Sequence, residues 1–188
     1  MSTIREDRRS DIELVELCNH AGAKEAAEAF EALYRRHRSF VLRVAMRFSN
    51  DRDIALDALQ ETFCYLLRKF PPQGEGLELT ARLTSLLYPV AKHYALDMRR
   101  KSDRFTDADS APEPHSAPAH GTDDIAGALA GLSPERREVL TLRFVDGLTM
   151  EEIAAALGIP VGTVKSRTHL AIRQLRNDPK TRDFFLEP

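Results

Sequence analysis

Residues 148–176 read LTMEEIAAALGIPVGTVKSRTHLAIRQLR and are typical of two helices joined by a tight turn. Thr149 is placed to cap the first helix, and Glu152 three residues later is placed to reach back, as in a capping box. Gly158 stands where a helix end needs a left-handed residue, and Pro160 has the fixed φ that suits the first turn of a second helix. This stretch therefore predicts a helix-turn-helix.

The second helix of this motif has a predicted buried stripe and a positively charged outer surface. Residues that suit burial recur at helical spacing at Val164, Thr168, Ala171 and Leu175. Residues 161–176 contain four basic residues and no acid, whereas residues 125–160 contain three basic and five acidic residues. This asymmetry favours a helix that lies on a phosphate backbone and enters a major groove. The alternative is a charged, solvated helix in an ordinary bundle.

The charge distribution predicts two small domains joined by a linker. Residues 102–124 carry six acids and one basic residue, with three prolines and almost no large apolar side chain, so we expect a flexible acidic linker. An acidic interaction tail is the alternative. The flanking domains are residues 1–101 and 125–188, and both lack strand periodicity. The expected fold class is therefore all-α, a helical bundle followed by the helix-turn-helix domain.

Four helical segments are expected in the first hundred residues. They cover about 11–19, 24–48, 53–70 and 80–101, with apolar residues at helical intervals that include Ile12, Leu56 and Leu67. Pro89 lies inside the fourth segment and lacks the N–H that a helix interior uses, so we expect a kink or a break there.

Composition argues against several other classes. The longest apolar runs are too short to span a membrane and the N-terminus has no apolar signal region, so the chain is expected to be soluble and cytoplasmic. Cys18 and Cys64 are expected to be buried free thiols, with a redox switch as the alternative. We expect no metal or cofactor, because neither metal-ligand spacing nor a glycine-rich phosphate loop is present. No catalytic motif is found, so we expect no enzyme activity.

Several motifs in this order resemble the extracytoplasmic-function (ECF) group of sigma-70 transcription initiation factors. The matching words are FEALY at 30–34, DALQETF at 57–63, YPVAKHYALDMRR at 88–100, LSPERREVL at 132–140 and GTVKSR at 162–167. The resemblance implies binding to core RNA polymerase and to promoter DNA. It also implies an anti-sigma protein as a partner.

The resemblance assigns three groups of residues. Asp57, Gln60 and Glu61 would face the clamp helices of the largest polymerase subunit, and Asp57 and Glu61 share one helix face. Promoter −10 contacts are expected from Tyr88, Lys92, His93, Arg99, Arg100 and Lys101, after a loop at 71–79 that would receive a flipped-out base. Promoter −35 contacts are expected from Thr163, Lys165, Ser166, Arg167, His169, Arg173 and Arg176. Tyr88 and Tyr94 would either stack on an unpaired base or fill the core.

The sequence departs from the family pattern at a few positions. The family usually has tryptophan, an arginine-like residue and asparagine where this chain has Leu86, Pro89 and His93, all in the −10 segment. Two other functions remain open from the residues alone. One is a helix-turn-helix regulator that acts without core polymerase, and the other is an adaptor that binds polymerase or an anti-sigma protein without DNA.

Overall fold

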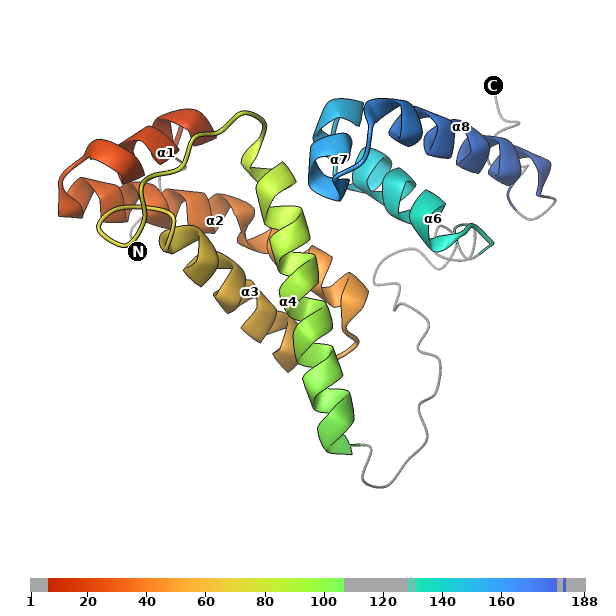
Figure 1. Ribbon diagram of the computed structural model, residues 1–188, viewed down its shortest axis with the longest axis horizontal. Coiled ribbons are helices and arrows are strands. Elements are labelled where there is room, and N and C mark those ends of the chain that lie inside the picture. The colour runs from red at the N-terminus through yellow and green to blue at the C-terminus, as the bar shows by residue number, and fades with distance from the viewer. Residues whose placement is uncertain (1–6, 107–128, 130, 179–180, 182–188) are drawn as a thin grey trace, which may run out of the picture. The chain divides into compact units, whose positions relative to one another are not determined.

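The structure is a computed structural model that describes residues 7–106, 129, 131–178 and 181 (Figure 1). Within these residues every regular element is a helix, which confirms the predicted all-α class. The chain divides between Ala117 and Pro118 into two compact units. Most of the predicted linker lies outside the described residues.

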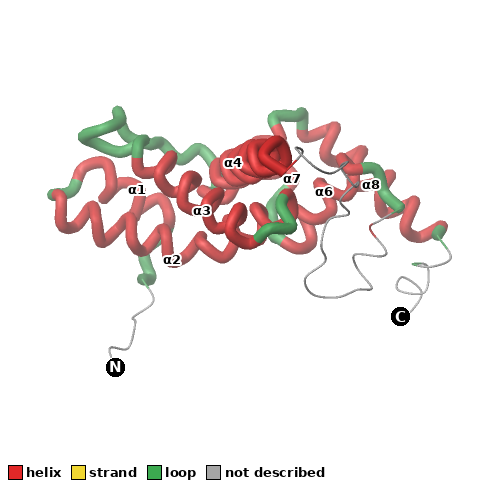
Figure 2. Tube along the Cα trace, turned by 90° about the horizontal axis from the view of Figure 1, so that it is seen from below, coloured by secondary structure: helices red, strands yellow, loops and turns green. Residues whose placement is uncertain are grey.

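The first unit contains four helices, α1 (Asp11–His20), α2 (Ala23–Phe48), α3 (Arg52–Leu67) and α4 (Leu83–Thr106). A capping box between Ser10 and Glu13 starts α1, and the Asp51 carboxylate accepts two backbone N–H groups at the start of α3. Helices α2, α3 and α4 pack against one another in pairs, and α1 packs on α2 (Figure 2).

Small side chains form the crossing point of the three longer helices. Ala45 of α2, Ala55 and Ala58 of α3 and Ala95 of α4 have no exposed surface and form one cluster. Because alanine carries only a methyl group, the helix backbones can approach closely there. This contact fixes which faces of α3 and α4 remain outside.

Three of the apolar residues expected inside are instead on the surface. Ile12, Leu56 and Leu67 are 60%, 40% and 47% exposed. In α1 the buried side is formed by Leu14, Val15 and Cys18, and Ile12 lies two residues before Leu14, which places it near the opposite side of the helix. At these three positions, the apolar pattern wrongly predicted burial.

Of the kink or break predicted at Pro89, the break is wrong, since α4 continues as one helix through this residue. Helix α4 packs against both α2 and α3, and such packing contributes more to helix stability than one missing backbone hydrogen bond removes. The helix also runs past Lys101, so residues 102–106 are helical rather than part of a linker. The sequence contains no proline or glycine there that would end the helix.

The second unit contains α6 (Pro134–Leu140), a π-helical turn η1 (Thr141–Val145), α7 (Met150–Leu157) and α8 (Val161–Asn177). The capping box of Thr149 and Glu152 is present, and Gly158 has a φ of 64°. Pro160 is the cap residue just before α8 rather than its first helical residue. The predicted helix-turn-helix is confirmed.

The predicted inner stripe of α8 is also confirmed, because Val164, Thr168, Ala171 and Leu175 are all buried. Ala171 and Leu175 pack with Leu132 and Leu140, which come from the segment that contains α6. Helix α8 therefore packs into the core of this unit with the side that carries the stripe.

An ion-pair network holds the start of α1 on α2. The Asp11 carboxylate accepts one hydrogen bond from Arg36 at 2.6 Å and lies 2.8 Å from Nε2 of His37, which is buried. Burial opposes ionisation of Asp11, but the hydrogen bonds and charges of His37 and Arg36 outweigh it and lower the pKa of the carboxyl. The ionised carboxylate thus stabilises the fold.

Asp11→Ala is expected to lower the free energy of unfolding at pH 7 by about 1–2 kcal/mol, because it removes two partly exposed charge-assisted contacts. Because the pKa of Asp11 is lower in the folded protein than in the unfolded chain, its ionised carboxylate stabilises the fold fully at pH values above the unfolded-state pKa of about 3.9. This stabilisation is lost as the pH falls through the pKa of the folded state. Urea unfolding at pH 7 and near pH 3 checks both statements. Glu16→Ala, which removes an exposed pair with His20 on the same helix, is the control and should change stability by less than about 0.5 kcal/mol. Equal effects of the two substitutions would contradict the assignment.

Candidate nucleic-acid and partner-binding surfaces

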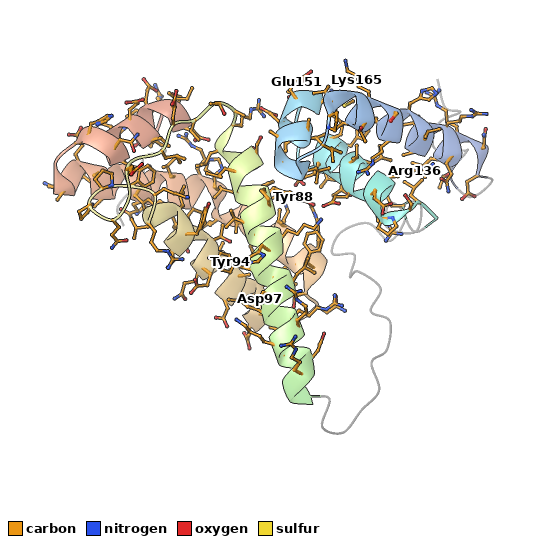
Figure 3. The ribbon with its side chains drawn as sticks, viewed as in Figure 1. Tyr88, Tyr94, Asp97, Arg136, Glu151 and Lys165 are labelled. Atoms are coloured by element: carbon orange, nitrogen blue, oxygen red, sulfur yellow. The ribbon has the colours of Figure 1, made fainter. Side chains whose placement is uncertain are left out.

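Helix α8 presents cations and small polar groups on the side opposite its buried stripe. Lys165, labelled in Figure 3, is exposed, as are Ser166, His169, Arg173 and Arg176, while Thr163 and Arg167 are half-buried. The described helix contains no acid. The second helix of the motif thus carries positive charge along its free side, which suits a DNA groove.

Two of these residues have local partners that the sequence did not reveal. The Ser166 hydroxyl donates to the Thr163 carbonyl oxygen at 3.0 Å. A backbone hydrogen bond and the Ser133 hydroxyl lower the pKa of Glu135, and the charge of Arg167 adds to this effect. Arg167 therefore lies near an acid of α6, whereas Lys165 is exposed at the start of α8.

The inner side of α8 is also fixed by hydrogen bonds. Arg136 of α6 donates to Oε1 of Gln174 at 2.9 Å, and Nε2 of Gln174 donates to the Gly131 carbonyl oxygen at 2.8 Å. Both ends of the Gln174 amide are used, so α8 is held against α6 near its C-terminal end. A helix fixed in this way can present its side chains in a defined register.

Tyr88 fills the core rather than forming a stacking surface. It is only 2% exposed, so its ring is not available to an unpaired base in this structure, and the stacking alternative is replaced by the core alternative. Ala91 and Ala95, which follow Tyr88 at helical spacing, are also buried, so Tyr88 lies on the packed side of α4. Tyr94, further along α4, is half-buried against the alanine cluster and contacts the exposed His93 edge-on (Figure 3).

The cations of α4 are paired with neighbours. Asp97 lies 2.8 Å from Lys101 and 3.7 Å from Arg100, and Arg99 lies 3.6 Å from Asp103. The hydrogen bond from Lys101 lowers the pKa of Asp97, and the charges of Lys101, Arg100 and His93 add to this effect. These pairs are partly exposed and about one helical turn apart, so they are weak.

Lys92 and Arg99 also reach across to α2. The Lys92 ammonium lies 5.2 Å from the centre of the Phe48 ring, and Arg99 donates to the Phe48 carbonyl oxygen at 3.3 Å. Of the predicted −10 residues, His93, Arg100 and Lys101 are exposed and Lys92 and Arg99 are half-buried, while Tyr88 is buried.

On α3, the three predicted polymerase-facing residues lie at the surface. Asp57 and Gln60 are exposed, and Glu61 is half-buried with its carboxylate 3.8 Å from Arg68. Beside them lies a shallow groove of about 430 Å³, lined mainly by apolar side chains of α2 and α3, namely Phe30, Tyr34, Leu56, Leu59, Gln60, Phe63, Cys64 and Leu67.

The sequence interpretation missed this groove because it assigned Leu56 and Leu67 to the core. The signal was present: Leu56, Leu59, Phe63 and Leu67 recur at helical spacing and form a stripe next to the acids. An apolar stripe beside acidic side chains suits a partner that offers both apolar and basic groups.

The thiols differ in their surroundings. Cys18 is buried, and burial raises its pKa to about 11, so the thiol stays protonated at neutral pH and is a poor nucleophile. Cys64 is only half-buried and lines the groove, contrary to the prediction that both are buried. Within the described part of the chain, no three potential metal ligands gather.

These features define a helical protein with a helix-turn-helix that is built to contact DNA. Two sequence families match it: Sigma-70 region 2 at residues 33–105 and Sigma-70, region 4 at residues 128–177. The chain is 38% identical over 167 residues to the ECF RNA polymerase sigma factor SigL of Mycobacterium tuberculosis, which covers 83% of this chain and 91% of SigL. It is 30% identical over 156 residues to the RNA polymerase sigma factor CarQ of Myxococcus xanthus, which covers 80% and 89%. The chain belongs to the ECF group of the sigma-70 family.

Solved structures have the same fold. CnrH, in complex with the cytosolic domain of CnrY, matches with a TM-score of 0.62 and 20% identity over 94% of this chain and 97% of CnrH. The sigma factor RpoE, in complex with the anti-sigma factor NepR from Bartonella quintana, matches with a TM-score of 0.56 and 24% identity over 78% and 94%. Among the helices that the structure describes, none is long and apolar enough to cross a membrane.

Tyr88→Ala is expected to lower the free energy of unfolding by about 3–5 kcal/mol, because it leaves a cavity where a buried ring stood. His93→Ala, an exposed neighbour on the same helix, should change stability by less than about 0.5 kcal/mol. Urea unfolding of the full chain measures both. Wild-type stability of the Tyr88 variant would show that the ring does not support the core.

Proposed function

We propose that this ECF sigma factor binds core RNA polymerase through α3 and directs promoter-specific initiation by reading the −10 element with α4 and its preceding loop and the −35 element with α8. The observation that carries the proposal is the presence in one chain of two exposed surfaces, the acidic face of α3 and the cationic side of α8. A repressor does not need the first, and an adaptor does not need the second.

At the −35 element, the N-terminal part of α8 enters the major groove. Lys165 and Arg167 donate to base edges, with Thr163, Ser166 and His169 beside them, and Arg173 and Arg176 hold phosphates. The buried stripe and the Gln174 contacts support this proposal, because they fix the helix while leaving these side chains outside.

At the −10 element, the loop at 71–79 receives a flipped-out base, and Lys92, Arg99, Arg100 and Lys101 hold phosphates of the separated strand. The pairs of Arg99, Arg100 and Lys101 with Asp97 and Asp103 are partly exposed, which supports exchange of carboxylate for phosphate at small cost. His93 is exposed at the position where the family usually has asparagine, and it faces the same strand.

At the polymerase, Asp57, Gln60 and Glu61 meet the clamp helices of the largest subunit. Carboxylates in these positions pair with basic groups of the partner, and the adjacent groove accepts apolar side chains. The three residues lie on one face of α3, which supports a single contact region.

The role is non-catalytic and is carried out in the cytoplasm. Residues 1–106 serve the polymerase and the −10 element, residues 125–188 serve the −35 element, and the acidic segment at 107–124 joins them. Because the two DNA contacts are tethered, the second becomes intramolecular and two weak contacts give usable affinity. An anti-sigma protein is the expected regulatory partner, since two proteins of similar fold were solved with such a partner or with the cytosolic domain of CnrY.

Run-off transcription from a promoter library with purified core polymerase tests the function. Discrete transcripts that require the added protein are expected, and they identify both promoter elements. Polymerase co-elution without transcripts would favour the adaptor, and absence of both would favour a regulator that acts without polymerase.

Lys165→Ala and Arg167→Ala are each expected to lower discrimination at one −35 position by about 1–3 kcal/mol, because a bidentate base contact is lost. Competition binding of the holoenzyme to promoters with single −35 substitutions measures this. Arg173→Ala is the matched control, since a phosphate contact should weaken binding about equally for all sequences. Unchanged selectivity in both variants would remove Lys165 and Arg167 from base reading.

Glu61→Arg is expected to weaken core polymerase binding without unfolding the protein, since it places a cation in an acidic contact face. Glu31→Arg is the matched control, because Glu31 forms a similar exposed pair with Arg35 on α2. Fluorescence anisotropy with labelled protein and core polymerase compares them. Normal binding by the Glu61 variant would refute its assignment.

A further inference from the structure

Asn19, near the end of α1, holds the loop between α3 and α4 by a pair of hydrogen bonds. Its Nδ2 donates to the Leu77 carbonyl oxygen at 2.9 Å, and its Oδ1 accepts from the Leu77 backbone N–H at 2.9 Å. The side-chain amide therefore satisfies both backbone groups of one loop residue. Such two-bond pairing fixes orientation as well as distance.

The same loop is attached to the end of α3 on its other side. The backbone N–H of Gly74 donates to the Phe70 carbonyl oxygen and that of Gly76 to the Lys69 carbonyl oxygen, both at 2.9 Å. Gly76 has a φ of +105°, and a Cβ there would lie 3.1 Å from Oδ1 of Asn19. Glycine is thus required where the loop passes Asn19.

Helix α1 is a firm support for this contact. Its start is held on α2 by Asp11 through Arg36 and His37, and Leu14, Val15 and Cys18 are buried beneath it. In Figures 1 and 2 the loop after α3 passes alongside α1 before it enters α4. Position 77 is therefore tied to the body of the first unit immediately before the segment that leads into α4.

We propose that Asn19 is a positioning residue that sets −10 base specificity by holding the loop at 71–79 in its base-receiving conformation. The inference rests on the proposed −10 function and adds to it a residue outside the stretch that matches Sigma-70 region 2. A loop rich in glycine and proline loses conformational entropy when it binds a base. By holding the loop in place before a base binds, Asn19 reduces the conformational entropy that the loop loses on binding. The preorganised loop then favours the base whose shape fits it.

The test compares Asn19→Ala and Asn19→Leu with His20→Ala in the full chain. Leucine matches asparagine in size but makes no hydrogen bond, and His20 is an exposed residue at the same helix end. Amide hydrogen exchange of Leu77 reports the contact itself. Holoenzyme binding to promoters with each base at every −10 and −35 position reports specificity.

We expect faster exchange of the Leu77 amide in both Asn19 variants, and discrimination at one −10 position that falls about tenfold. Discrimination at −35 and affinity for core polymerase should match those of His20→Ala. Unchanged Leu77 exchange, unchanged −10 discrimination, or an equal loss at both elements would each overturn the proposal. Absence of −10 discrimination in the wild-type protein would instead refute the proposed function itself, so the two failures are distinguishable.

Discussion

The close crossing of α2, α3 and α4 over four alanines is the constraint on which the first unit depends. Because these side chains have no exposed surface and no room beside them, the rotation of each helix about its axis is fixed. The fixed rotation turns Asp57 and Gln60 of α3 outward and buries Tyr88 of α4. A larger residue at this crossing would move the helices apart and alter both surfaces together.

The sequence predicted the helix-turn-helix almost in full because local chemistry determines it. The capping box at Thr149, the left-handed Gly158 and the buried stripe that includes Ala171 each depend on residues within one or two turns. The helices of the first unit were also predicted in number and order. Their exact course was not, since α4 continues through Pro89, where packing outweighs local preference, and past Lys101, where no proline or glycine ends it.

What sequence reasoning missed depends on contacts between distant segments. To predict the groove beside α3, one has to know that Leu56 and Leu67 face away from the alanine crossing. The bonds between Asn19 and Leu77 join positions with no sequence pattern in common. The ion pairs of Asp97 with Lys101 and Arg100 could have been predicted from helical spacing. They were missed because only the cations of this segment, and not its acids, were considered.

Those acids bear on how the protein meets DNA. The chain has a formal net charge of −2, so long-range attraction to a phosphate backbone is small, and the cations of α4 are already paired. The Asp97 carboxylate is ionised at neutral pH, as aspartates ordinarily are, and it competes with a phosphate for Arg100 and Lys101. Binding by α4 alone is therefore an exchange of one anion for another with little gain. In the proposed function, α8 and the tether to polymerase supply the affinity that α4 alone lacks.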